Sequence, residues 1–139
     1  MFKHILVPTD LTERSLNALA IAVKLALREE SRITLLHVIE TIQDTELDDF
    51  SDFYEKLGRR ASRKMEQMIR QYREGQLTIQ TEITYGKRVK EIIHFATNQE
   101  IDLIILSSHK IEADNAVQGW GTISYKVSIL SHCPVMLVK

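Results

Sequence analysis

The chain has 139 residues, which fits one domain over residues 1–139 that folds without disulfides or metals as staples. Its 18 Lys and Arg residues nearly balance 19 Asp and Glu residues, and a net charge of -1 gives no field that would attract nucleic acid or a membrane surface. The chain has a single cysteine, which excludes an internal disulfide framework. No apolar run approaches the roughly 20 residues of a membrane span. We therefore expect a cytoplasmic protein.

The amino-terminal residues predict a strand followed by a helix. Residues 3–9 are a short run of branched apolar side chains that Pro8 ends, as expected of a central strand. Asp10 begins a D-x-x-E pattern, in which the aspartate caps a helix by accepting a hydrogen bond from a free backbone amide. The helix is expected to face a sheet with one apolar stripe, made of Leu16, Leu19, Ala20, Val23, Ala26 and Leu27.

The next segment predicts a buried strand and a long helix. Residues 32–39 are apolar enough for a strand covered on both faces. In the long helix that follows, acidic residues precede basic ones, and this order of charges is stabilised by the helix dipole. We expect this helix to end before Gly75. Its basic side chains are interpreted as a solvated face, with a docking surface for another protein as the alternative. The apolar stripe of this helix is Phe50, Phe53, Tyr54, Leu57, Ala61, Met65, Met68, Ile69 and Tyr72.

The remaining residues continue the alternation of strand and helix. Residues 77–84 alternate between apolar and polar side chains, which predicts a strand near a sheet edge. Gly86 and Lys87 turn the chain into the next helix. The later elements are a helix around residues 89–96, a strand over residues 101–106, a helix over residues 122–131 with Ile123, Val127 and Leu130 inward, and a last strand over residues 134–138.

Strict alternation predicts a three-layer α/β fold, in which helices cover both faces of a five-stranded parallel sheet. A central first strand and a peripheral third strand give the order 3-2-1-4-5, with a crevice between strands one and four. Thr9 and Asp10 then lie opposite Ser107 and Ser108. Because the chain re-enters a helix at Gly121 and Thr122, the sequence predicts a potential anion site at this edge of the sheet.

Segments spread along the chain, in the right order, resemble the universal stress protein family of UspA type. These segments are Ile5–Asp10, Leu35–Val38, Asp102–His109, Gly121–Thr122 and Cys133–Val138. The resemblance implies an adenine nucleotide alpha hydrolase-like fold, a cytoplasmic homodimer often built through the last strand, and a role in stress resistance.

The resemblance allows the residues that would surround the phosphates of a bound nucleotide to be compared with the family pattern. Nucleotide-binding members carry Gly-x-x-Gly, about nine residues, and then Gly-Ser or Gly-Thr. Here Ser107 and Lys110 stand at the first two glycine positions, and Gly121-Thr122 follows after one residue more than in the family pattern. Glycines let a loop take positive φ and bring amides against phosphate oxygens. Lys110 adds bulk and restricts φ, although its ammonium can partly offset the loss as a point charge.

Asp10 and Val38 match positions that nucleotide-binding members use around the nucleoside. The preferred hypothesis is a homodimeric interaction module of the stress response with a degenerate nucleotide crevice. The alternative is an ATP- or ADP-binding member with a modified phosphate loop, so ATP or ADP is the one possible cofactor. The candidate nucleotide-binding residues are Pro8, Thr9, Asp10, Val38, Ser107, His109, Lys110, Gly121 and Thr122.

The sequence predicts no catalytic or metal site. Ser107, Ser108 and His109 lack the G-x-S-x-G turn of a hydrolase, and no acid is placed by sequence to orient the histidine. The five histidines lie on separate predicted elements without the spacing of metal ligands. Slow ATP hydrolysis is a corollary of the alternative hypothesis alone.

The last strand and one aromatic residue are candidates for protein contacts. An apolar edge strand invites aggregation unless it is paired, so we expect a symmetric dimer with two such strands antiparallel. Trp120, between two glycines, is interpreted as a local core under its loop, with contact to a partner as the alternative. The expected dimer interface is Pro134, Val135, Met136, Leu137 and Val138.

Overall fold

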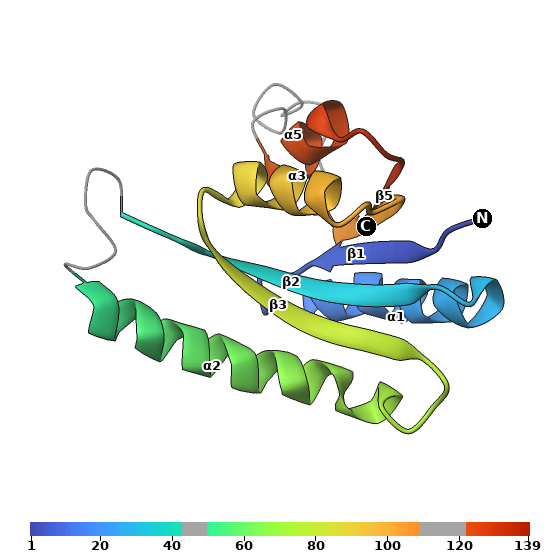
Figure 1. Ribbon diagram of the computed structural model, residues 1–139, viewed down its shortest axis with the longest axis horizontal. Coiled ribbons are helices and arrows are strands. Elements are labelled where there is room, and N and C mark those ends of the chain that lie inside the picture. The colour runs from blue at the N-terminus through green and yellow to red at the C-terminus, as the bar shows by residue number, and fades with distance from the viewer. Residues whose placement is uncertain (43–49, 109–121) are drawn as a thin grey trace.

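A parallel sheet of five strands is the centre of the computed structural model, which describes residues 1–42, 50–108 and 122–139 (Figure 1). The strand order is β3-β2-β1-β4-β5, so the predicted fold class and order are confirmed. The strands are β1 (His4–Pro8), β2 (Arg32–Glu40), β3 (Thr78–Gly86), β4 (Leu103–Ser107) and β5 (Val135–Val138). The helices are α1 (Arg14–Glu29), α2 (Ser51–Ile69), the short 3-10 helix η2 (Arg70–Tyr72), α3 (Arg88–Asn98) and α5 (Ile123–Leu130).

Helices cover both faces of the sheet, α1 and α2 on one face and α3 and α5 on the other (Figure 1). Because successive strand residues point to opposite faces, β1 contributes to both cores. Ile5 and Val7 pack with α1 and α2, whereas Leu6 packs against Ile92 of α3 and Val127 of α5. Every residue of β1 is buried, as expected of a central strand.

The two edge strands differ in how they are covered. β3 alternates between exposed and partly buried residues along most of its length, which confirms the prediction from its alternating sequence. β5 forms the opposite edge and pairs with β4 from Ile104↔Val135 to Ser107↔Val138. Its edge position is therefore confirmed, while pairing with a second copy stays a prediction.

Some residues of the predicted apolar stripes lie at the surface. Leu27 is 58% exposed and Leu16 is also exposed, because both lie beyond the buried face of α1, which is made of Ser15, Ala18, Leu19, Ala22, Val23 and Ala26. The prediction that Leu130 points inward is wrong, since it is 60% exposed. The packed face of α5 ends at Val127, and the final turn extends beyond it.

The start of α2 also differs from its predicted stripe. Phe50 and Phe53 are exposed, and both have edge-to-face ring contacts with the buried Tyr54. At this end of α2 the buried residue of the stripe is Tyr54, which makes a further edge-to-face contact with Tyr85 of β3. The acidic residues expected before α2 at positions 44–49, and Trp120, lie outside the described residues.

No helix among the described residues is both long and apolar enough to span a membrane.

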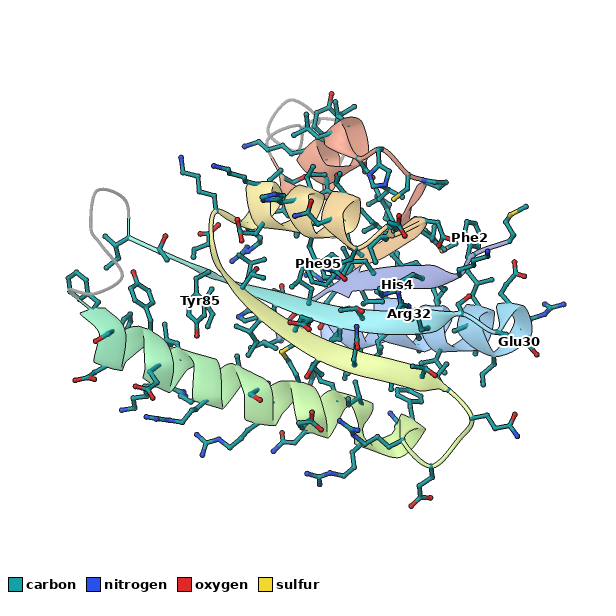
Figure 2. The ribbon with its side chains drawn as sticks, in the orientation of Figure 1. Phe2, His4, Glu30, Arg32, Tyr85 and Phe95 are labelled. Atoms are coloured by element: carbon teal, nitrogen blue, oxygen red, sulfur yellow. The ribbon has the colours of Figure 1, made fainter. Side chains whose placement is uncertain are left out.

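A buried histidine lies within the sheet, which the sequence did not single out. His4 is 3% exposed, and its Nε2 lies 2.7 Å from the hydroxyl of Thr34, which also accepts a hydrogen bond from Gln80. Arg32 is the register partner of His4 on β2, and Figure 2 shows the two residues on these neighbouring strands. Burial and then the Arg32 charge lower the pKa of His4, against smaller opposing effects of the Gln99 carbonyl and the Asp102 carboxylate.

We predict that acid destabilises the protein through His4. The unfolded chain takes up this proton near the ordinary pKa of 6.5, and the folded chain only at lower pH. The stability linked to neutral His4 is therefore fully present above pH 6.5 and is lost progressively as the pH falls below it. Urea unfolding between pH 8 and 5 measures this loss.

The variant His4→Gln should flatten this part of the pH profile, even if it is less stable at every pH. His94, exposed on α3, provides the matched control His94→Gln. Equal pH profiles for the wild type and His4→Gln would contradict the prediction.

Candidate functional site

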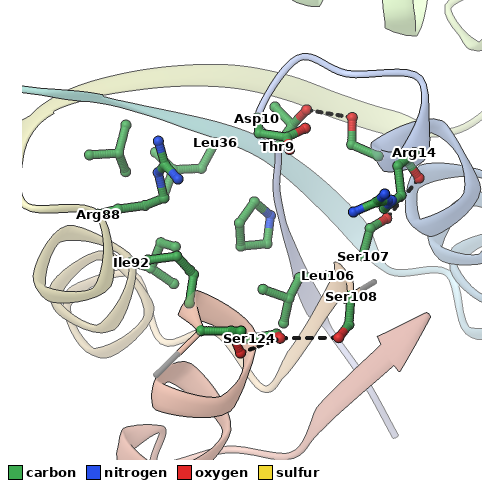
Figure 3. A pocket seen from close by; sticks show the side chains of 15 residues that line it. Thr9, Asp10, Arg14, Leu36, Arg88, Ile92, Leu106, Ser107, Ser108 and Ser124 are labelled. Carbon is green, nitrogen blue, oxygen red and sulfur yellow. Dashed lines mark hydrogen bonds between the residues drawn. The ribbon is translucent and has the colours of Figure 1, made fainter. Parts of the chain in front are cut away.

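A pocket of about 220 Å³ lies at the carboxyl ends of β1 and β4 (Figure 3). After these neighbouring strands the chain continues to helices on opposite faces of the sheet, the arrangement that leaves a crevice in open α/β sheets. The lining residues are Pro8 at the end of β1, Thr9, Asp10, Arg14 and Ser15 around the start of α1, Leu36 and Val38 of β2, Arg88 and Ile92 of α3, Leu106 and Ser107 of β4, Ser108 directly after it, and Thr122, Ile123 and Ser124 at the start of α5.

The turn between β1 and α1 forms one wall of the pocket. Asp10 Oδ1 accepts hydrogen bonds from the amide of Thr12 at 3.0 Å and from the Thr12 hydroxyl. Leu11 lies in the left-handed region with φ 68°, and this turn brings the carboxylate to the amide two residues ahead. The predicted helix cap at Asp10 is therefore wrong: α1 begins at Arg14, and the carboxylate stabilises the preceding turn instead.

A chain of side-chain hydrogen bonds holds this wall against the sheet. The Thr9 hydroxyl donates to Ser15 Oγ at 2.7 Å, and Ser15 donates to the Thr12 carbonyl at 2.7 Å. The Thr9 carbonyl lies 2.8 Å from His37 Nδ1, which must carry the proton because a carbonyl only accepts. These hydrogen bonds hold the turn that places Asp10 at the pocket.

The charge on Asp10 is stabilised at neutral pH. Partial burial raises the pKa of Asp10, but the hydrogen bonds from Thr12, with help from the Arg88 charge, outweigh that effect and hold the pKa below its ordinary value. Asp10 therefore offers an ionised acceptor beside the pocket, suited to hydroxyl or amine donors of a ligand.

Hydroxyl groups form the opposite wall. Ser107 Oγ donates to the Arg14 carbonyl at 2.8 Å, which ties the end of β4 to the start of α1. Ser108 Oγ and Ser124 Oγ lie 3.1 Å apart, and both residues are buried. Thr122 accepts from the amide of Tyr125 at 3.3 Å and so caps α5. The predicted juxtaposition of the first and fourth strand ends is confirmed in these contacts.

The sequence-predicted site residues fall into two groups. Pro8, Thr9, Asp10, Val38, Ser107 and Thr122 all line the pocket. His109, Lys110 and Gly121 lie outside the described residues. The structure adds Arg14, Ser15, Arg88 and Ser124, among others, to the lining, which also contains Ser108, the residue that the sequence set opposite Asp10. Arg14 and Arg88 each begin a helix at the carboxyl edge of the sheet, and this position was the sequence signal that could have found them.

A second hollow, of about 740 Å³, adjoins the first on the side of α2. The two share Asp10, Val38 and Arg88. Arg60 and Lys64 line the second hollow and belong to the predicted basic face of α2, and both are exposed. Their exposure fits both the solvated face and the docking surface, so this interpretation stays a prediction.

Comparison with known proteins decides the family. The model described as "Universal stress protein family" matches the chain over residues 1–139. The chain belongs to the universal stress protein family. Universal stress protein YxiE of Bacillus subtilis is 27% identical to it over 154 residues, covering 100% of both chains. The solved structure of universal stress protein UspA from Lactobacillus plantarum aligns with a TM-score of 0.82 at 26% identity, covering 99% of this universal stress protein and 98% of that chain.

Two further solved structures with this fold contain nucleotides. One is a universal stress protein in complex with cAMP, with a TM-score of 0.69 at 17% identity, covering 99% of this chain and 97% of that one. The other is the universal stress protein from Archaeoglobus fulgidus in complex with dAMP, with a TM-score of 0.69 at 13% identity, covering 100% and 98%. At these identities the likeness to this universal stress protein is one of fold.

We predict that Asp10→Ala destabilises this universal stress protein by about 1 kcal/mol, because the turn loses the acceptor for Thr12. Asp10→Asn keeps an acceptor oxygen and should lose less. Urea unfolding at pH 7 measures both changes. Equal stability of the Ala variant and the wild type would show that the turn forms without this side chain.

Proposed function

We propose that this universal stress protein is a cytoplasmic, homodimeric binding module of the stress response. Its crevice holds the nucleoside part of an adenine nucleotide and binds a triphosphate weakly. The observation that carries the proposal is the pocket between β1 and β4, which is lined by Asp10 and Val38, the two positions that the family resemblance assigns to the nucleoside. The cAMP and dAMP complexes of proteins with the same fold support the ligand class.

The pocket offers what a nucleoside needs. Leu36, Val38, Ile92 and Leu106 provide apolar walls for a base, as in other small-molecule sites. The Asp10 carboxylate is available to accept from ribose hydroxyls, and a hydrogen bond to a charged acceptor is worth roughly 1.5–3 kcal/mol. Asp10 and the apolar walls together would set affinity for the nucleoside.

The phosphate end supports a weak hold on a triphosphate. Ser107 occupies the first glycine position of the family pattern, and its hydroxyl is engaged with the Arg14 carbonyl. A side chain at this position reduces the freedom of the loop to turn its amides toward phosphate oxygens. The second substituted position, Lys110, lies outside the described residues.

We also propose that the protein binds its ligand without catalysing a reaction. Ser107 and Ser108, which the sequence analysis weighed as hydrolase residues, make hydrogen bonds within the fold. Ser107 donates to the Arg14 carbonyl, so this hydroxyl is not held by a general base that would activate it as a nucleophile.

We predict that AMP binds to the wild type and that Asp10→Asn weakens binding about tenfold, because the variant keeps the turn but removes the charged acceptor. Isothermal titration calorimetry with AMP, ADP, ATP and GMP measures the affinities. Glu74→Gln is the control, since Glu74 is exposed and lines neither this pocket nor the adjoining hollow.

Two results would overturn the proposal. If no adenine nucleotide binds at millimolar concentration, the proposal that the crevice binds an adenine nucleotide is wrong. A nanomolar to low-micromolar dissociation constant for ATP would overturn the weak hold on a triphosphate and favour the alternative of an ATP- or ADP-binding member.

The dimer is proposed from the β5 edge. Met136 on β5 is 39% exposed, and on the neighbouring α5 the side chains of Tyr125, Ile129 and Leu130 are exposed as well. An unpaired edge strand with apolar side chains is protected from aggregation when it pairs with an identical strand across a two-fold axis.

We predict that Met136→Asp converts the dimer to a monomer, because it places two charges near the two-fold axis in an apolar interface. Analytical ultracentrifugation at tens of micromolar protein measures the mass. Thr78→Asp, on the opposite edge strand β3, is the control and should remain dimeric. A monomeric wild type under these conditions would count against the dimer.

A further inference from the structure

A basic cluster covers the outward face of α2. Its five side chains are all exposed, and they are Lys56, Arg59, Arg60, Arg63 and Lys64. At about 100° per residue these positions span roughly 140° of the helix surface, on the side opposite the buried Tyr54, Ala61 and Met65. Figure 2 shows side chains with nitrogen tips that extend from α2 away from the sheet. The basic cluster therefore faces away from the core.

The charge of the basic cluster is not balanced within the fold. Residues 55–64 contain these five cations and one acid, Glu55, although the whole chain has a net charge of -1. Glu55 pairs with Arg59 at 3.4 Å, and in the described parts of the chain the other four cations form no ion pair. Like charges three and four residues apart destabilise a helix. The helix dipole does not offset this effect, because the cluster lies in the middle of α2 and the last turn contains no basic residue.

An apolar patch lies at the amino-terminal end of the same helix. Its members are between 37% and 51% exposed, and they are Ile42, Phe50, Phe53 and Tyr85. The buried Tyr54 joins them, because its ring makes edge-to-face contacts with the other three rings and its hydroxyl accepts a hydrogen bond from the Ile42 amide at 2.8 Å. Phe53 precedes Lys56 by three residues, so the two side chains are neighbours on the helix surface and the apolar patch adjoins the basic cluster.

A glycine inside α2 allows Tyr85 to take its place in this patch. Figure 2 shows Tyr85 between β3 and α2. A Cβ at Gly58 would lie 2.5 Å from the Tyr85 hydroxyl oxygen, so a larger residue would displace the ring. Glycine within a helix is less stable than alanine. The chain therefore has a residue that weakens α2 at the position where the helix meets a partly exposed aromatic ring.

The two features together favour a short acidic segment of another protein as partner. Cations without an ion pair attract carboxylates, and exposed aromatic rings can bury an apolar side chain of the partner. An exposed apolar patch beside charged residues is typical of a protein contact. An extended polyanion such as a nucleic acid or an anionic membrane is less suited. The chain outside residues 55–64 has a net negative charge, which would repel it.

We propose that the basic cluster and the adjoining apolar patch form a docking surface for an acidic protein segment that carries an apolar side chain. Carboxylates of the segment pair with cations such as Lys56 and Arg63, and its apolar side chain packs against Phe53. The surface lies at the β3 side of the sheet, opposite to β5, so a dimer through β5 does not involve it. It contains no residue of the pocket between β1 and β4, and the inference therefore goes beyond the proposed function.

Fluorescence anisotropy with labelled peptides tests the proposal on the full chain. The probe is a peptide of about 12 residues that is rich in Glu and contains one Phe. Two comparison peptides replace every Glu by Gln, or the Phe by Ala. We expect the probe to bind at micromolar concentration in low salt and about tenfold more weakly at physiological salt, because exposed charges are screened. Both comparison peptides should bind more weakly than the probe.

Variants of the basic cluster and the apolar patch locate the binding. Lys56→Gln combined with Arg63→Gln should weaken binding of the probe about tenfold, since both cations are exposed and neither is in an ion pair of the described residues. Lys24→Gln combined with Arg28→Gln removes two exposed cations from α1 and is the matched control, which should bind like the wild type. Phe53→Ala should weaken binding of the probe about fivefold and have little effect on the peptide with Ala. Thermal unfolding confirms that each variant is folded.

Several results would overturn the docking surface. These are no binding of the probe, equal binding of the peptide with Gln, unchanged binding in the Lys56 and Arg63 double variant, or an equal loss in the α1 control. If duplex DNA of about 20 base pairs, or vesicles of phosphatidylserine and phosphatidylcholine, bind more tightly than the probe, the choice of a protein partner is wrong. If the wild type binds the probe but no adenine nucleotide, the docking surface is supported and the proposed function is overturned.

Discussion

Burial of β1 on both faces is the constraint on which the rest of the structure depends. Its five residues are all buried, and it pairs with the parallel strands β2 and β4 on its two sides. The side chains alternate between two apolar cores, which requires helices on both faces. Because the chain leaves β1 toward one face and leaves β4 toward the other, a crevice forms where these two strands end.

Short hydrogen bonds then give this crevice a defined lining. The bond from Ser107 to the Arg14 carbonyl joins two segments that are 93 residues apart in sequence. On the other side of β1, the His37 ring holds the Thr9 carbonyl, and Thr9 holds Ser15. Each contact fixes a polar group that borders the crevice, so the donors and acceptors are positioned before any ligand arrives. Such preorganisation lowers the cost of ordering side chains when a ligand binds.

The electrostatics of the crevice come from side chains on three elements. Asp10 belongs to the turn after β1, Arg14 to α1 and Arg88 to α3, and the Arg88 charge helps to keep Asp10 ionised. One carboxylate and two guanidinium groups therefore border a pocket that also has apolar walls from Leu36, Val38, Ile92 and Leu106.

The amino-acid sequence by itself determined the fold class, the strand order and the outline of the crevice. The spacing of apolar residues and the composition of each segment were sufficient for this. Parallel strands that are buried on both faces have continuous apolar runs, whereas an edge strand alternates between apolar and polar residues. The family was also visible in the sequence, since the segments from Ile5–Asp10 to Cys133–Val138 follow one another in the order of the family. Of the predicted nucleotide-binding residues within the described ranges, all line the pocket.

Only the tertiary structure decided which polar groups meet there. The sequence placed Asp10 as a helix cap, whereas the left-handed Leu11 directs its carboxylate to Thr12. Local patterns do not encode a backbone turn that packing imposes on a residue other than glycine. The arginines were missed for a related reason: Arg14 and Arg88 look like solvated helix residues in sequence, and they become neighbours of one pocket only because the sheet order brings the starts of α1 and α3 to the same edge.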